Sequence, residues 1–277
     1  MASPPSAALV ERLMDSIDRA TASDIDVPFS VYTSVHEQRL LDVPINKPLL
    51  VVVLRGSKHV GRSPVQVCSA GEFVFLSDSA AVDMRNIPGD ERYHALLIEF
   101  DYADFDVLPV GAAPPTTQVI GVSEAPFLDC LQQWVDSVGW GMPAITAARK
   151  RELLAVLSAL GHTGLRGLMG RSELSHRLYD LLSRDADEET SLAALCRALG
   201  VSESTLRRRL HAEGTGLQAI KDAVRLGRAL HLLQTTAMPI GVIAGRCGYS
   251  SQSRFTARFK ARFGLTPSAL RKTHVTG

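Results

Sequence analysis

The sequence predicts an α+β protein of two domains, a strand-rich front domain and an all-helical back domain. Between Val27 and Asp101, short apolar or alternating runs are separated by turn residues, which is the pattern of a small antiparallel sandwich or barrel. After Arg171, the apolar residues recur at helical spacing. The charged residues are also divided between the two parts, with an excess of acidic residues in the front and of basic residues in the back. Residues 1–170 carry 13 Lys and Arg against 20 Asp and Glu, whereas the chain from Ser191 onward carries 14 against 3.

The basic back half indicates nucleic-acid binding, because clustered Lys and Arg neutralise phosphates. The alternative is a basic face that only aids solubility. The total charge of +1 says nothing about partners, since the two halves offset each other.

The front domain begins with a short helix, Leu9–Arg19, whose apolar residues have helical spacing. Val107–Thr117 is rich in Pro, Gly and Ala and is expected to be a connector to two helices, Phe127–Val138 and Ile145–Leu160. The expected strands are Phe29–Thr33, Pro48–Leu54, Val65–Cys68, Glu72–Leu76, Val82–Asn86 and His94–Phe100.

The boundary between the domains is expected where glycine is dense. Gly161–Gly170 contains four glycines and is the best candidate for a hinge. We therefore expect a front domain over residues 1–165, a hinge over residues 166–174 and a back domain over residues 175–277.

The cysteines and the N-terminus indicate a cytoplasmic protein. The N-terminus lacks the pattern of a secretory signal, and no apolar stretch reaches membrane-spanning length. Cys68, Cys130, Cys196 and Cys247 form no CxxC pair and are expected to be reduced, mostly buried thiols, with a redox-sensing role for one of them as the alternative.

Residues 191–214 have the layout of a helix-turn-helix. Ser191 can cap a supporting helix whose apolar face is Leu192, Leu195 and Leu199, and Gly200 permits a tight turn. Ser202 can then cap a recognition helix that buries Leu206 and Leu210.

The same layout returns over residues 239–264. Pro239 begins a helix with the apolar residues Ile240, Ile243 and Ala244, and Gly248 and Tyr249 form the turn. Ser250 is expected to cap the second recognition helix, which buries Phe255, Phe259 and Phe263.

Leu217–Thr235 joins the two motifs as one long helix. At 1.5 Å per residue its nineteen residues span about 28 Å. Successive major grooves on one face of DNA lie about 34 Å apart. The helix and its turns can therefore place two recognition helices in successive grooves.

The polar residues of the recognition helices suit DNA. Arg207 and Arg208 can donate paired hydrogen bonds to guanine, Gln252 suits adenine and Arg254 suits guanine or phosphate. Glu203 either accepts a hydrogen bond from cytosine N4 or only interacts favourably with the dipole at the N-terminus of its helix. Arg207→Ala is expected to weaken binding to one half of the DNA site and Arg254→Ala to the other. The alternative for any one arginine is a solvated charge. The expected DNA-binding residues are Ser202, Glu203, Ser204, Arg207, Arg208, Ser250, Ser251, Gln252, Ser253, Arg254 and Arg258.

Residues 175–272 resemble the DNA-binding domain of the arabinose-operon regulator (AraC/XylS) family of transcription regulators. Leu210 and Leu270 stand where many members have Phe and Tyr, which are apolar-for-aromatic changes on buried faces. The residues that carry the resemblance are Arg225-Leu226, Ala229, Leu232-Leu233, Ile243-Ala244, Gly248-Tyr249, Ser250, Ser253, Phe255, Arg258-Phe259-Lys260, Phe263-Gly264, Thr266-Pro267-Ser268 and Arg271.

The front domain resembles, less specifically, the cupin-like sensor domain found in part of that family, through residues 47–60, 70–77 and 94–101. The resemblance implies a small β-barrel that binds an effector, and a dimer interface on Phe127–Val138 and Ile145–Leu160. The alternative is that these helices only cover the barrel. The expected function is a DNA-binding transcription regulator, usually an activator in this family, with operator DNA, RNA polymerase, a small-molecule effector and a second copy of the chain as partners.

Two other functions stay open. The front domain can serve only to dimerise or to bind an antagonist protein, without a small ligand. A more distant alternative is a cupin enzyme fused to a DNA-binding module. His36, His59 and His94 form no HxH pair, and phosphate loops, nucleophile elbows and HExxH motifs do not occur. We therefore expect no metal, no cofactor and no catalytic residue.

Overall fold

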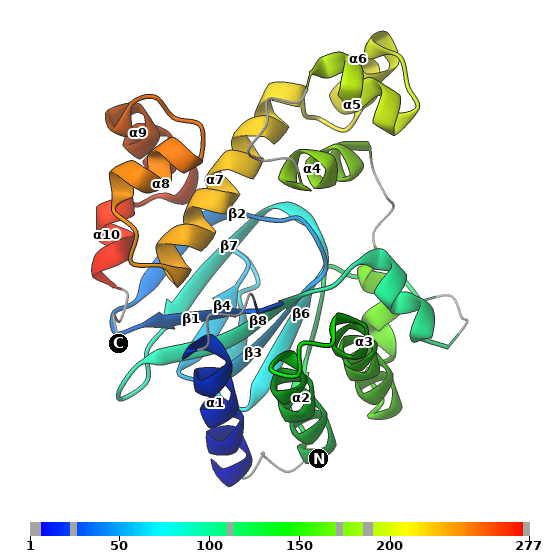
Figure 1. Cartoon of the computed structure of the whole chain (residues 1–277), viewed down its shortest axis with the longest axis vertical. Coiled ribbons are helices and arrows are strands. Elements are labelled where there is room, and N and C mark those ends of the chain that lie inside the picture. Colours follow the sequence, from blue (N-terminus) through cyan, green and yellow to red (C-terminus); the bar gives the residue numbers. More distant parts are fainter. Residues whose placement is uncertain (1–6, 23–26, 110–112, 170–173, 185–190, 274–277) are drawn as a thin grey trace. The chain divides into compact units, whose positions relative to one another are not determined.

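The computed structural model describes residues 7–22, 27–109, 113–169, 174–184 and 191–273, and Figure 1 shows the elements. The described chain divides into two compact units. The first contains residues up to Gln38, Lys47–Asp78 and Met84–Met169. The second contains Arg39–Asn46, Ser79–Asp83 and the chain from Gly170 onward.

A five-stranded antiparallel sheet of order β1-β8-β3-β6-β9 forms the centre of the first unit (Figure 1). The strand β3 is apolar along almost its whole length, as expected for a strand covered on both faces. The strands are β1 (Ser30–Ser34), β3 (Leu49–Arg55), β6 (Glu72–Leu76), β8 (Tyr93–Glu99) and β9 (Gln118–Val122).

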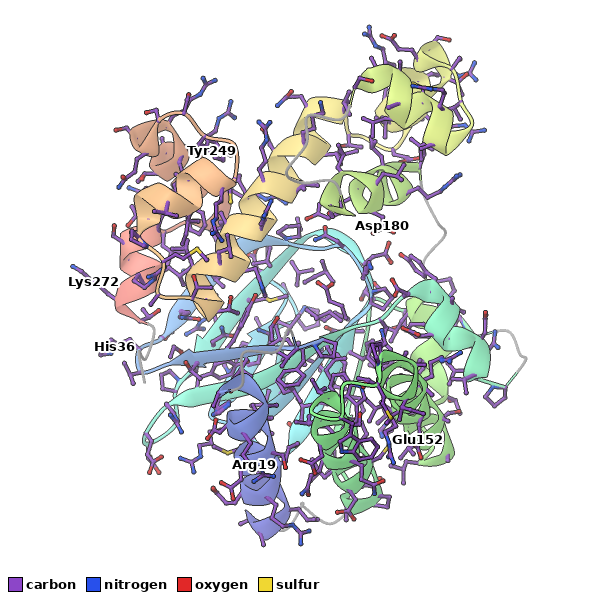
Figure 2. All side chains as sticks on the ribbon, in the orientation of Figure 1. Arg19, His36, Glu152, Asp180, Tyr249 and Lys272 are labelled. Atoms are coloured by element: carbon purple, nitrogen blue, oxygen red, sulfur yellow. The ribbon has the colours of Figure 1, made fainter. Side chains whose placement is uncertain are left out.

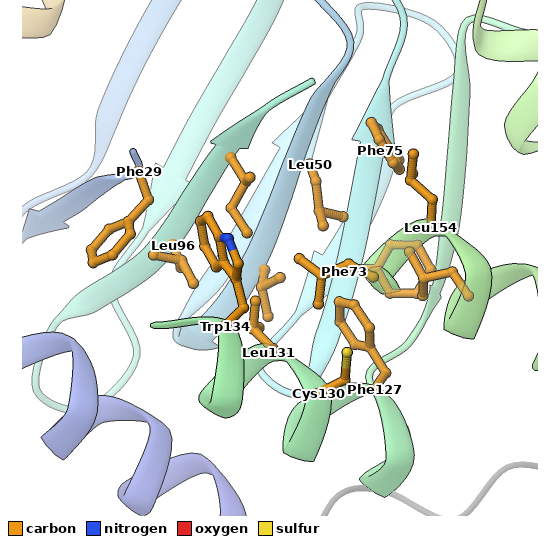
Figure 3. Close-up of a cluster of buried hydrophobic side chains, with 14 of the residues drawn as sticks. Phe29, Leu50, Phe73, Phe75, Leu96, Phe127, Cys130, Leu131, Trp134 and Leu154 are labelled. Atoms are coloured by element: carbon orange, nitrogen blue, oxygen red, sulfur yellow. The ribbon is translucent and has the colours of Figure 1, made fainter. Parts of the chain in front are cut away.

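Helices cover one face of this sheet. Because side chains alternate along a strand, Leu50 and Val52 of β3 point to the helices while Val51 and Val53 point to the other face. Figure 3 shows Trp134 and Phe127 packed on the sheet; their rings lie 5.6 Å from Phe29 and 5.7 Å from Phe73. The covering elements are α1 (Ala7–Ala22), α2 (Ala125–Val138), α3 (Pro143–Ala159), η1 (Tyr102–Val107) and η2 (Thr163–Leu168).

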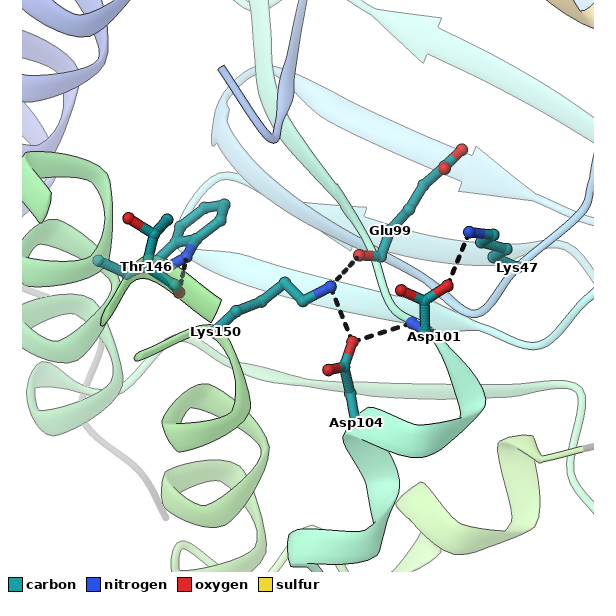
Figure 4. A network of polar contacts seen from close by, with 7 residues as sticks. Lys47, Glu99, Asp101, Asp104, Thr146 and Lys150 are labelled. Atoms are coloured by element: carbon teal, nitrogen blue, oxygen red, sulfur yellow. Dashed lines mark hydrogen bonds and ion pairs between the residues drawn. The ribbon is translucent and has the colours of Figure 1, made fainter. Parts of the chain in front are cut away.

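Polar contacts join α3 to the end of β8 (Figure 4). The ammonium of Lys150 lies 2.7 Å from a carboxylate oxygen of Asp104 and donates to the carbonyl oxygen of Glu99. Asp104 also accepts from the backbone N–H of Asp101, whose carboxylate pairs with Lys47 at 2.7 Å. The network fixes η1 between the sheet and the helix.

The second sheet has four strands in the order β2-β7-β4-β5, and the pairings described in the structure do not join the two sheets into one closed barrel. Its strands are β2 (Gln38–Ile45), β4 (Ser57–Val60), β5 (Gln66–Ser69) and β7 (Ser79–Ile87). The predicted α+β fold class with a strand-rich front domain is confirmed, whereas the expected small β-barrel is not closed by these pairings.

The strand predictions were incomplete. The six expected strands all form, with ends shifted by a few residues, but β2, β4 and β9 were not expected. In β2 the positive φ of 47° at Asp42 interrupts the alternation, and β4 buries a lysine. In β9, the rings of His162 and Phe73 lie so close to Gly121 that a side chain at this position would overlap them.

The expected hinge falls partly outside the described residues. Residues 170–173 are not described, whereas Thr163–Leu168 forms η2 and buries Leu165 and Leu168 in the core of the first unit. The hinge over residues 166–174 therefore stays a prediction. Residues 110–112 of the expected connector and residues 274–277 of the expected back domain also lie outside the described part.

The cysteines are free thiols, and Cys68, Cys130 and Cys247 are buried. Burial raises the pKa of Cys68 and of Cys130 to about 12, so both stay protonated. Because the thiolate is the reactive form, burial disfavours oxidation at these two positions.

The described residues of the second unit after Glu173 form helices joined by short turns, as predicted (Figure 1). One apolar cluster packs α4, α5, α6 and the start of α7, and a second group packs α8, α9 and α10 on the end of α7. The helices are α4 (Leu174–Arg184), α5 (Leu192–Leu199), α6 (Glu203–Ala212), α7 (Leu217–Thr235), α8 (Ile240–Arg246), α9 (Gln252–Phe263) and α10 (Pro267–Lys272). No described helix is both long and apolar enough to cross a membrane.

Candidate DNA-binding site

The first helix-turn-helix forms as the sequence predicts. The hydroxyl of Ser191 accepts from the backbone N–H of Ala194 at the start of α5, and Ser202 accepts from Thr205 at the start of α6. Gly200 ends α5 with a φ of 67°, which glycine adopts without a steric penalty. Leu206 and Leu210 are each 1% exposed, so the polar residues of α6 are left on its outer face.

The second motif forms with a different helix start. The sequence predicted that Ser250 caps α9, but the cap is Ser251, whose hydroxyl accepts from the backbone N–H of Arg254 at 3.4 Å. The prediction was wrong by one residue, because both serines have side chains that can cap a helix. Phe255, Phe259 and Phe263 are fully buried, as predicted.

Ser251→Ala is expected to destabilise the second motif by about 1 kcal/mol, the usual cost of losing an N-cap hydroxyl. Ser250→Ala is the matched control and should change stability by less than about 0.5 kcal/mol, because this exposed hydroxyl is not the cap. Urea unfolding of both variants measures the difference. A larger loss in Ser250→Ala would contradict the observed helix start.

The linker helix α7 spans Leu217–Thr235, as predicted, and holds the second motif. The side chain of Arg225 lies against Gly248 in the turn between α8 and α9, where an added Cβ would lie 3.3 Å from Nε. Arg258 of α9 lies 4.0 Å from Asp222 of α7. Tyr249 stands in the same turn (Figure 2), beside the charges of Asp222, Arg225 and Arg258.

Glu213 has a role that the sequence did not reveal. It follows α6 directly, and its carboxylate accepts from the backbone N–H groups of Leu174 and Ser175 at 3.1 and 2.9 Å. These amides begin α4 and have no partner within that helix. A negative charge there also suits the helix dipole. Glu213 therefore fastens α4 to the C-terminal end of the recognition helix α6.

Glu213→Ala is expected to lower the free energy of unfolding of the second unit by about 1–3 kcal/mol, because two amides lose a charged acceptor. The control is Glu203→Ala on the same helix, whose pairing with Arg207 is solvent-exposed and contributes about 0–0.5 kcal/mol. Urea unfolding checks both values. Equal, small losses would show that the Glu213 contacts contribute nothing.

The eleven expected DNA-binding residues are all exposed on α6, on α9 or at the residues just before these helices. Arg207 donates to Glu203 one turn earlier on α6, so this guanidinium has a partner in the DNA-free protein. Arg208 has no ionic partner within the described residues, which leaves its full hydrogen-bonding capacity for a ligand.

The two recognition helices have the same register relative to their caps. The inward residues Leu206 and Phe255 each lie four positions after the cap. Arg254 therefore corresponds to Thr205, and Arg258 corresponds to Arg209. Arg209 is exposed and was not among the expected site residues. Its spacing from Ser202 equals the spacing of Arg258 from Ser251. This equivalence can be recognised only when Ser251, and not Ser250, is taken as the second cap.

The comparisons with known proteins agree with this geometry. A family model described as a helix-turn-helix domain matches residues 195–273. The urease operon transcriptional activator of Escherichia coli is 33% identical over 91 residues, covering 33% of this chain and 31% of that protein. The regulator AdiY of Escherichia coli strain K12 is 28% identical over 134 residues, covering 46% and 53%. The chain thus spans about a third to a half of these relatives.

Solved structures match over most of the chain. ToxT from Vibrio cholerae strain SCE256, bound to an unsaturated fatty acid, has a TM-score of 0.64 at 14% identity and covers 91% of this chain and 98% of ToxT. At this identity the likeness shows the fold alone. The family match and the relatives concern the helical part of the chain: residues 195–273 match a helix-turn-helix domain, and the predicted resemblance of this part to the AraC/XylS family of transcription regulators is confirmed.

Proposed function

We propose that the chain is a sequence-specific DNA-binding transcription regulator, acting as an activator, whose first unit binds a small-molecule effector. The observation that carries the proposal is the pair of capped recognition helices in one basic unit, with every expected contact residue exposed. The relatives support this proposal, since their names describe transcriptional activators and regulators.

The effector role is supported by fold. ToxT matches this chain over most of its length, and two of its structures contain an unsaturated fatty acid or (E)-4-(8-methylnaphthalen-1-yl)but-3-enoic acid. Operator DNA, RNA polymerase and a second copy of the chain complete the proposed partners, and the cytoplasm is the proposed compartment. The eleven expected residues, with Arg209 added, are the proposed DNA contacts.

The alternative is a regulator whose first unit only dimerises or binds an antagonist protein. The observation that favours it is the apolar surface at the turn between α2 and α3, where Trp140, Met142 and Ile145 are exposed. The apolar faces of the two helices themselves pack on the sheet, so a dimer interface there stays a prediction.

A genome-wide binding map tests the function. We expect discrete sites upstream of a few transcription units, and lower transcription of those units when the gene is deleted. The affinity for such a site should fall steeply with salt, because several phosphate contacts release counterions. A binding map without discrete sites, together with a DNA affinity that does not change with salt concentration, would contradict the proposal.

A further inference from the structure

The strand β5 lies at an edge of the four-stranded sheet, and within the described residues its sheet neighbour is β4 alone. Directly after β5, the N–H of Ala70 donates to the carbonyl oxygen of Gly56, just before β4, at 3.0 Å. In an antiparallel pair, the backbone groups of successive residues point alternately toward the partner strand and away from it. The N–H and C=O groups of Ser69 and Val67 therefore point away from β4.

The two outward N–H groups of this edge have different surroundings. The N–H of Ser69 donates to a carboxylate oxygen of Glu72 at 2.7 Å, which agrees with its outward direction. The N–H of Val67 has no hydrogen-bond partner within the part of the chain that the structure describes. Unpaired N–H and C=O groups on an edge strand are a template for pairing with another strand. Val67 is therefore the position at which a further strand can join the sheet.

The side chains of this edge are apolar. Val65 and Val67 are 47% and 49% exposed, and they project from one face because they lie two residues apart. Native proteins commonly place charged residues on an edge strand to prevent pairing, whereas β5 carries none. Because β-branched residues stabilise cross-strand pairs, the two valines favour the addition of a strand.

The charges beside the edge fit a second copy of the same edge. The exposed Arg62 precedes β5, and Glu72 follows it. When two identical edges pair antiparallel, the beginning of one strand lies beside the end of the other, so that Arg62 of each copy comes close to Glu72 of the other. A parallel pair would bring like charges together, which is unfavourable. The edge is thus complementary to itself about a two-fold axis, the commonest symmetry of protein dimers.

We propose that two copies of the chain associate through their β5 strands and form one antiparallel sheet across the two-fold axis. At its centre, the N–H of Val67 in each copy donates to the carbonyl oxygen of Val67 in the other. This inference rests on the proposed function for its partner, the second copy of the chain, and it assigns that partner to a surface other than α2 and α3.

Sedimentation equilibrium of the full-length chain tests the interface. We expect a monomer–dimer equilibrium for the wild type. The dimer dissociation constant should be at least about tenfold higher for Val67→Lys, because two ammonium groups would then lie opposite each other. Val67 is half exposed, so this variant should keep the thermal melting curve of the wild type. Trp140→Lys is the matched control, since it places the same charge on the exposed turn between α2 and α3 and should not change the dissociation constant.

Charge reversal gives a second test that does not depend on the valine. Arg62→Glu and Glu72→Arg should each weaken the dimer, because each variant places like charges together at both ends of the paired strands. The double variant restores opposite charges and should recover most of the lost affinity. A double variant that dimerises more weakly than both single variants would overturn the antiparallel pairing.

A wild type that stays monomeric also overturns the interface, as does a dimer that Trp140→Lys weakens and Val67→Lys leaves unchanged. Selective DNA binding is measured in the same samples. If the wild type dimerises through β5 but binds no DNA site selectively, the interface stands and the proposed regulator function fails. If a chain that stays monomeric binds such a site, the regulator function stands and the interface fails.

Discussion

Phe259→Ala is expected to unfold the second helix-turn-helix motif while the first one stays folded. Phe259 is fully buried at the centre of α9, with its ring 5.7 Å from that of Phe255 and 4.6 Å from that of Phe263. Removing a buried aromatic ring costs about 3–5 kcal/mol, since the lost contacts leave a cavity. The free energy of unfolding of a whole domain is only about 5–15 kcal/mol. We therefore expect that the small second motif does not stay folded after such a loss.

Hydrogen exchange read along the chain measures this effect. Amides of α8 and α9 should lose protection in Phe259→Ala, whereas amides of α5 and α6 should exchange as in the wild type, because they pack in a separate apolar cluster. Phe259→Leu is the control and should lose far less protection, since it keeps most of the buried volume. Protection lost equally in both motifs would mean that the unit unfolds as a single cooperative body.

Arg208→Ala and Arg254→Ala are expected to weaken DNA binding in different halves of the site. A bidentate contact between arginine and guanine contributes about 1–3 kcal/mol, which is about a 5- to 150-fold change in affinity. Both side chains are exposed, and they lie on different recognition helices. Arg207→Ala is expected to have a smaller effect than Arg208→Ala, because Arg207 must first give up its bond to Glu203.

Electrophoretic mobility shifts give the affinities, and footprints show which half loses protection. Arg12→Ala is the control for net charge, since it removes an arginine that faces Asp129 in the first unit. If the two recognition-helix variants retain wild-type affinity and protection, these arginines are solvated charges without a role in binding.

The helical unit was largely predictable from sequence. Its caps, its glycine turns and its buried leucines and phenylalanines are local signals with a fixed spacing, so the bounds of α7 were predicted to the residue. The cap of α9 was missed because Ser250 and Ser251 are adjacent and chemically identical. Arg209 was missed for the same reason, since its equivalence to Arg258 depends on the correct cap.

The contacts that were not predictable are made between distant segments. Glu213 meets the first amides of α4 across 38 residues, and no local pattern marks it as a cap. Lys58 stood in a short polar stretch that gave no strand signal, because a buried lysine breaks the alternation of apolar and polar residues. Its position became clear only when the pairing of β4 with β5 and β7 was known.

The central claim is that two recognition helices of one chain bind successive major grooves. Hydroxyl-radical footprinting of the wild type on a duplex selected from a random library tests it most directly. We predict two protected segments about 10 base pairs apart on one face of the duplex, one lost in Arg208→Ala and the other in Arg254→Ala. A single protected segment, weakened equally by both variants, would contradict the claim.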